Sequence, residues 1–247
     1  MKRRALIPCF AACMAVACGK GSGHCLRKEG SVGDEERLSG VFFQNITVHN
    51  PLELYIRPHQ PEKVVVTAGE NLRDLIRTEV PEGSDRLWLK NQNACLWLGK
   101  YKATFRCTVS LQNLWDMRLE NFGDVWFLDT LRTPYCVTTC NLSAGTVHVL
   151  VNNDQFLWTQ NSGVMNLEAQ GRCDHLFLYL KDRGHVRCEN LKARTAYIFT
   201  EGSGPVRVHV TDTLTLLLDG LGDVYYSGQP YIRLLSHTGQ GKLIHVP

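Results

Sequence analysis

Six aromatic residues recur at matched positions in three successive stretches of the chain. They are Phe156 and Trp158, Phe177 and Tyr179, and Tyr197 and Phe199. One residue separates the two members of each pair, so both rings lie on the same face of an extended strand. Aromatic side chains bind sugar rings and also the apolar surfaces of partner proteins. We predict that the six residues form an outward ligand-binding surface. The alternatives are that N-terminal strands or a second subunit cover this face, or that the inward and outward sets are reversed and the rings lie in the core.

Charged residues that could act in catalysis are few and far apart. Asp124 and Asp223 occupy matching positions five repeat units apart, much farther than the carboxyl pair of a glycosidase. Arg187 and Arg207 match in neighbouring units, with His148 two units before Arg187, and we interpret them as solvated surface residues. The sequence contains no HExxH, Gly-x-Ser-x-Gly, phosphate-loop or calcium-repeat motif. We therefore predict no catalytic residue, no metal site and no cofactor.

A recurring glycine marks the elements that must position these residues. From Gly123 onward, glycine followed two places later by an aliphatic residue or Met occurs seven times, at intervals of 18 to 22 residues. The seven glycines are Gly123, Gly145, Gly163, Gly184, Gly204, Gly222 and Gly241. Apolar and polar residues alternate around each one, which is the period of a β-strand with one face inward. Each unit thus contains two short strands and a corner, where glycine is expected to supply a positive φ.

A single unit of this size cannot bury its apolar face. Stacking similar units buries that face and places like residues above one another at about 4.8 Å. We predict an all-β fold, a right-handed parallel β-helix (solenoid) with about 20 residues per turn. Strand patterns over 40–110 are expected to begin the stack and cap it, with a helical turn within 71–76. The alternative is an antiparallel sandwich with turns every 8–12 residues.

The N-terminus carries a targeting signal. Three cations at positions 2–4 precede an uncharged, mostly apolar run over 5–17. This run is too short to cross about 30 Å of hydrocarbon as a helix, and it fits the apolar region of a secretory signal. It ends in Ala15-Val16-Ala17-Cys18, which resembles the lipobox of bacterial lipoproteins, although an alanine stands where leucine is usual. We predict a signal peptide over 1–17, lipidation of Cys18 and a membrane anchor; the alternative is a plain secretory signal.

The rest of the chain divides into a tether and one domain. Residues 18–39 are rich in glycine and charge, which predicts a flexible tether. No linker-like composition interrupts 40–247, so we predict a single domain there. A lipid-anchored chain of this kind is expected in the bacterial cell envelope, at the outer membrane. No acidic cluster of the kind that directs some lipoproteins to the surface follows Cys18, so the periplasmic and the surface face both stay open.

Seven cysteines remain once the signal is removed and Cys18 is lipidated. They are Cys25, Cys95, Cys107, Cys136, Cys140, Cys173 and Cys188. In an oxidising compartment some are expected to pair, and an odd number leaves at least one free. Cys136 and Cys140 lie about 13 Å apart on one extended strand, beyond disulfide reach. Cys188 falls at an inward position and is expected to be a small core residue.

Several segments resemble the bacterial GIN-domain family of adhesin-like head domains. They are Gly21-Ser22-Gly23, residues 37–40, 64–72 and 78–83, and near the end 222–230 and 238–241. The resemblance covers 40–247, although the corners at 121–123 and 182–184 depart from the Ser-Gly-Ser-Gly-Asp pattern of the family. It implies a secreted or lipid-anchored β-helix with an adhesive or binding role.

Composition and charge set further limits. The 247 residues are 44% hydrophobic and 21% charged, which is typical of a globular chain. The formal net charge is +3, and it falls to zero without the three cations of the signal, so nucleic acid is excluded as a partner. We predict a non-enzymatic cell-envelope lipoprotein that binds a glycan or a protein through the six aromatic residues. The alternatives are a carbohydrate-active enzyme on the same fold, and a structural module that forms a homo-oligomer through the aromatic face.

Overall fold

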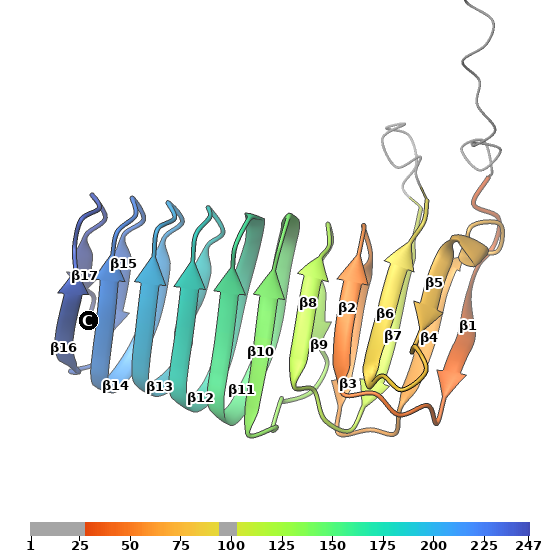
Figure 1. Ribbon diagram of the computed structural model, residues 1–247, viewed down its shortest axis with the longest axis horizontal. Coiled ribbons are helices and arrows are strands. Elements are labelled where there is room, and N and C mark those ends of the chain that lie inside the picture. Colours follow the sequence, from red (N-terminus) through yellow and green to blue (C-terminus); the bar gives the residue numbers. More distant parts are fainter. Residues whose placement is uncertain (1–27, 94–102) are drawn as a thin grey trace, which may run out of the picture.

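The computed structural model describes residues 28–93 and 103–247, which form one coiled sheet (Figure 1). The signal peptide predicted over 1–17 and Cys18 lie outside these residues. The strands are β1 (Val32–Ser39), β2 (Asn45–His49), β3 (Glu53–Pro58), β4 (Lys63–Gly69), β5 (Ile76–Glu79), β6 (Arg86–Asn91), β7 (Phe105–Leu111), β8 (Asp116–Glu120), β9 (Val125–Phe127), β10 (Tyr135–Cys140), β11 (Ser143–Gln160), β12 (Gly163–Leu180), β13 (Val186–Thr200), β14 (Val206–Leu218), β15 (Val224–Ser227), β16 (Tyr231–Ser236) and β17 (Leu243–His245). A 3₁₀ turn, η1 (Arg73–Leu75), lies where a helical turn was predicted.

Two walls of parallel strands enclose the core. The first wall contains β6, β2, β8, β10, the C-terminal halves of β11 to β14, and β16. The second wall contains β7, β3, β9, the N-terminal halves of β11 to β14, and then β15 and β17. The strands β11 to β14 bend from the second wall to the first without leaving the sheet. The predicted parallel solenoid is therefore confirmed, and the antiparallel sandwich is excluded.

Successive turns keep a period close to twenty residues. On the first wall Phe177 pairs in parallel with Tyr197, so the same position returns after twenty residues. On the second wall an inward position is occupied by a buried aliphatic residue in turn after turn. These residues are Val125, Val147, Leu167, Val186, Val206 and Val224. Because like side chains lie over like, the apolar core runs unbroken between the walls.

The first turns do not follow the order of the chain. The turn made by β2 and β3 lies between the turn of β6 and β7 and the turn of β8 and β9. The chain therefore leaves the stack after β3 and re-enters it one turn farther out. As predicted, the strands before residue 110 begin the stack and cap it, but β2, β3, β6 and β7 are full members of the two walls.

Antiparallel strands close the N-terminal end of the solenoid. β4 pairs with β7, β5 pairs with β6, and β1 pairs with β4, all antiparallel. Such a cover protects a solenoid edge that would otherwise be open to pairing with another chain. Because β1 occupies Val32–Ser39, the prediction of a flexible tether up to residue 39 is wrong, and the folded domain begins before residue 40.

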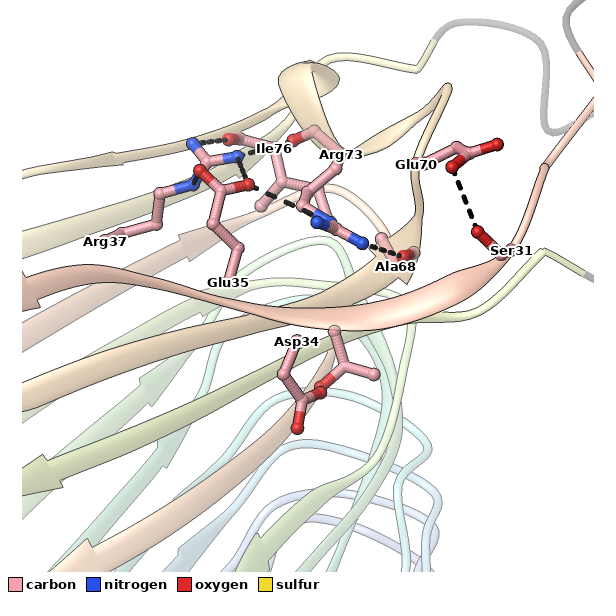
Figure 2. Close-up of polar contacts among 9 residues, drawn as sticks. Ser31, Asp34, Glu35, Arg37, Ala68, Glu70, Arg73 and Ile76 are labelled. Atoms are coloured by element: carbon pink, nitrogen blue, oxygen red, sulfur yellow. Dashed lines mark hydrogen bonds and ion pairs between the residues drawn. The ribbon is translucent and has the colours of Figure 1, made fainter.

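Two arginines fasten this cap (Figure 2). Arg37 of β1 donates to the main-chain carbonyls of Ile76 at 3.2 Å and Arg73 at 2.9 Å, and its Nε lies 2.7 Å from the carboxylate of Glu35. Arg73 in turn donates to the carbonyl of Ala68 at 3.2 Å. A guanidinium presents several donors in one plane, so a single side chain joins the outer strand to η1 and β5.

The corner glycines are required mainly by contact between turns. A Cβ atom on Gly204 would lie 2.1 Å from the carbonyl oxygen of Gly184, and one on Gly222 would lie 2.2 Å from that of Gly204. Among the seven glycines of the repeat, only Gly145 and Gly163 have a φ in the left-handed region. The expectation of a positive φ is therefore wrong for the other five, where close backbone packing is the reason for glycine.

We predict that Gly204→Ala destabilises the fold by about 3 kcal/mol, because the added methyl group meets a main-chain carbonyl that cannot move away. Gly40→Ala is the control: Gly40, unlike Gly204, has a positive φ, and a Cβ there has no atom within 4 Å. The control should lose about 1 kcal/mol. Chemical denaturation of the two variants measures the difference. Equal losses would show that turn-to-turn contact is not the constraint.

Candidate functional site

The outward face of the first wall carries a strip of exposed aromatic rings on β12 and β13. Phe177 and Tyr197 are in register, as are Tyr179 and Phe199. The exposed fractions are 37% for Phe177, 36% for Tyr179 and 40% for Tyr197, while Phe199 is half-buried. These four residues, here called the aromatic strip, are the part of the predicted surface that faces outward.

Phe156 and Trp158 are not part of the strip. They are 2% and 1% exposed and pair in register with the core residues Leu176 and Leu178. The prediction that these two rings face outward is therefore wrong, and the core alternative holds for them. The outward positions beside Phe177 and Tyr179 on β11 belong instead to Leu157 and Thr159.

The error comes from aligning the units on glycine. Gly163 pairs with Ser143, whereas Gly184 packs on Met165, so Gly163 and Gly184 are not equivalent. Counted between equivalent paired positions of the two walls, the corner after β11 is one residue longer than the corner after β12. A shift of one residue moves a strand's side chains to the opposite face. Aligning the units on the alternation of buried and exposed residues avoids this shift.

Two of the four rings of the strip are stacked on each other, and a cation lies over one of them. Tyr179 and Phe199 are stacked, with ring centroids 4.8 Å apart and an angle of 18° between the planes. The Nζ atom of Lys181 lies 5.1 Å from the centroid of the Tyr179 ring and 3.4 Å from Glu201. Hydrogen bonds with Tyr179 and then with Glu201 raise the pKa of Lys181. The strip therefore combines apolar rings and two tyrosine hydroxyls with the adjacent cation of Lys181. Sequence reasoning did not identify Lys181.

Asp124 and Asp223, the corner residues considered for catalysis, accept hydrogen bonds from main-chain amides. Asp124 Oδ1 accepts a hydrogen bond from the amide of Thr146 at 2.8 Å, and Asp223 Oδ1 accepts one from the amide of Lys242 at 2.8 Å. In each case the donor belongs to the next turn. The two carboxylates thus have the same structural role five turns apart, and the structure does not bring them together.

A family model described as "putative auto-transporter adhesin, head GIN domain" matches residues 42–230. The chain belongs to this GIN-domain family. The match spans most of the described solenoid and confirms the resemblance found in the sequence. No similar protein is found among the curated proteins.

Solved structures share the fold of this GIN domain at low sequence identity. A putative adhesin from Bacteroides fragilis NCTC 9343 has a TM-score of 0.76 and 18% identity, with 87% of this chain and 97% of that chain covered. A putative adhesin from Parabacteroides merdae ATCC 43184 has a TM-score of 0.62 and 15% identity, covering 88% and 97%. A putative lipid binding protein from Parabacteroides distasonis ATCC 8503 has a TM-score of 0.61 and 16% identity, covering 88% and 98%.

The second wall of the GIN domain carries a polar column instead of an aromatic strip. Trp126 stacks on His148 with centroids 3.7 Å apart, and His148 Nδ1 lies 3.0 Å from Glu168. Glu168 pairs with Arg187 at 2.8 Å, and Arg207 follows in register on the next turn. The imidazole of His148 and the guanidinium of Arg187 thus both contact the Glu168 carboxylate, within one column of surface residues.

The cysteines that the structure describes are unpaired core residues. Cys107, Cys136, Cys140, Cys173 and Cys188 are all buried and free, so the expected pairing does not occur among these five. Burial raises the pKa of Cys107, Cys136 and Cys173 to about 12, and it raises that of Cys140 and Cys188 as well. Cys25 and Cys95 lie outside the described residues. As predicted, Cys188 is a small core residue.

Over 28–93 and 103–247, no three His, Cys, Asp or Glu side chains gather where they could hold a metal ion. The same ranges contain no helix with the length and hydropathy needed to cross a membrane.

We predict that two aromatic truncations destabilise the fold to different extents. Trp158→Ala should cost about 3 kcal/mol or more, because it leaves a cavity in the core. Tyr179→Ala should cost about 1 kcal/mol or less, because it removes one exposed stacked ring. Denaturant unfolding of both variants is the measurement, and a larger loss for Tyr179→Ala would contradict the placement of the strip on the surface.

Proposed function

We propose that this protein is a non-catalytic adhesin of the bacterial cell envelope. Membership of a family described as adhesin head domains supports an adhesion or binding role, as do the two structural neighbours described as adhesins. The solenoid suits this role, because it holds side chains at fixed spacing along an extended surface. The partner is a glycan or a protein on a surface that the protein contacts.

The aromatic strip is the proposed contact surface. The observation that carries this assignment is the exposure of Phe177, Tyr179 and Tyr197 on two adjacent turns of a rigid wall. Tyrosine supplies a large contact area at a low cost in conformational entropy, and its hydroxyl adds a hydrogen bond. Because Tyr179 is already ordered by stacking on Phe199 and by Lys181, this ring loses little conformational freedom on binding.

A test of the strip compares two double variants of the full chain. Tyr179→Ser with Tyr197→Ser removes two exposed rings of the strip, and we expect binding to fall at least tenfold. Tyr135→Ser with Tyr231→Ser removes two exposed tyrosines of the same wall outside the strip, and binding should be retained. Binding is measured on a glycan array and on plates coated with mucin or with purified extracellular-matrix proteins.

The competing roles give different results in the same experiment. Equal binding by the two double variants, or no binding of the native protein on any surface, would exclude the strip as an adhesive site. Conversion of a dimer to a monomer by the strip variant, seen by sedimentation, would identify a homo-oligomer interface instead. Cleavage of a glycan on the array would identify the carbohydrate-active enzyme.

We further propose that a lipid on Cys18 anchors the protein in the outer membrane. The motif Ala15-Val16-Ala17-Cys18 after a short apolar run supports this attachment. The described chain begins at residue 28, beside the antiparallel cap, whereas the aromatic strip lies several turns away along the solenoid (Figure 1). An anchor before the cap would therefore leave the strip clear of the membrane.

The anchor is tested by metabolic labelling with an alkyne-bearing fatty acid. The native chain expressed in a bacterium should incorporate the label and fractionate with membranes, because acyl chains hold a protein at the bilayer. Cys18→Ser should incorporate none and leave the membrane fraction, while Cys25→Ser should behave as the native chain. A native chain without label would support the plain secretory signal, and labelling that persists in Cys18→Ser would show that another site is acylated.

A further inference from the structure

A polar groove lies at the bend where β11 to β14 cross from the second wall to the first. Its volume is about 490 Å³, which is within the range of small-ligand sites. One edge is formed by Asn152, Arg172 and Lys192, which are in register on three successive turns. The other edge contains Asp154, Asp174 and Arg194. The aromatic strip begins a few residues farther along the same strands.

The first edge presents two neighbouring cations toward the groove. Arg172 Nε donates to Asn152 Oδ1 at 2.7 Å, which orients the guanidinium and leaves its terminal nitrogens available. Lys192 is exposed on the next turn and forms no ion pair within the described chain. Adjacent turns are about 4.8 Å apart, so one anionic group can contact both side chains.

The second edge is acidic and only partly neutralised. Arg194 lies 3.9 Å from Asp174 and 3.5 Å from Asp212, and it contacts the ring of His175 at 3.2 Å. Asp154 is exposed and makes no ion pair in the part of the chain that the structure describes. The groove therefore offers unpaired cations on one edge and an unpaired carboxylate on the other.

One residue that lines the groove has a buried amide without a hydrogen-bond partner among the described residues. Asn153 lines the groove at the position that Cys173 and Ala193 occupy in the next two turns. It is 8% exposed, and neither atom of its amide has a hydrogen-bond partner among the described residues. A buried amide is costly unless a further polar group pairs with it, which makes this position unusual in an apolar column.

We propose that the groove binds a sugar acid, a saccharide unit with one carboxylate and several hydroxyls. The carboxylate is held by Arg172 and Lys192, and the hydroxyls donate to Asp154 and to Asn152. A dense polyanion fits poorly because the acidic edge repels it, and a neutral sugar leaves the two cations without a partner. This inference deepens the proposed adhesive function by naming the class of glycan.

The groove and the strip form one continuous surface. His175 contacts Arg194 at the acidic edge, and its ring centroid lies 6.4 Å from that of Phe177 in the strip. A chain of sugars with its acidic unit in the groove can therefore extend over the aromatic rings. The groove would then supply specificity for the acid, and the strip would supply apolar contact.

Isothermal titration of the full chain with paired probes tests the proposal. The acidic probes are trigalacturonic acid and sialyllactose, and the neutral counterparts are the carboxyl-reduced trisaccharide and lactose. Arg172→Gln with Lys192→Gln is compared with Arg183→Gln with Lys242→Gln, which has the same charge change at two other exposed corners. We expect at least tenfold tighter binding of an acidic probe than of its neutral counterpart, a tenfold loss in the groove variant and less than twofold in the control.

Several outcomes would overturn the proposal. These are no binding of either acidic probe, equal losses in the two double variants, or equal affinity for the neutral sugars. Tighter binding of inorganic phosphate or a heparin oligosaccharide than of the sugar acids would show simple anion attraction. If the strip variant loses surface binding while the groove variant keeps it, the adhesive function stands and the sugar-acid site fails.

Discussion

Parallel main-chain hydrogen bonds between successive turns are the interaction on which the rest of this structure depends. They hold each strand directly over its counterpart, as in the pairing of β12 with β13 over most of their length. At the corners the turns approach so closely that a Cβ atom on Gly204 or Gly222 would overlap the carbonyl of the turn below. The backbone thus sets the spacing, and side chains must conform to it.

This constraint converts a position in the repeat into a column on the surface. The same geometry produces the buried aliphatic column of the second wall, the Trp126–His148–Glu168–Arg187 column outside it, and the aromatic strip on the first wall. Because each column is fixed by the sheet, its side chains need little further ordering to bind a partner. A solenoid can therefore vary its surface chemistry, turn by turn, without changing its core.

The N-terminal cap and the turns of β11 to β14 differ in how their strands pair. At the N-terminal end, β1, β4 and β5 run antiparallel to their neighbours, and Arg37 and Arg73 tie them to main-chain carbonyls. The surface with the strip and the groove lies on β11 to β14, which are the longest strands of the described sheet and pair in parallel, with register shifts between β12 and β13 and between β13 and β14. The chemistry proposed for binding is thus built on the longest parallel strands of the described fold.

The sequence by itself determined the period, the parallel stack, the inward aliphatic column and the family, because these depend on local alternation and on a repeat that recurs many times. It also indicated the strip through Phe177, Tyr179, Tyr197 and Phe199. Only the tertiary structure decided that Phe156 and Trp158 are core residues. One extra residue in a corner shifts the glycine-based alignment by one position, and this shift assigns the side chains of the strand to the opposite face. Three other features likewise depend on pairings between distant segments, which no local pattern specifies. They are the insertion of β2 and β3 next to β8 and β9, the folding of 32–39 onto β4, and the groove at the bend.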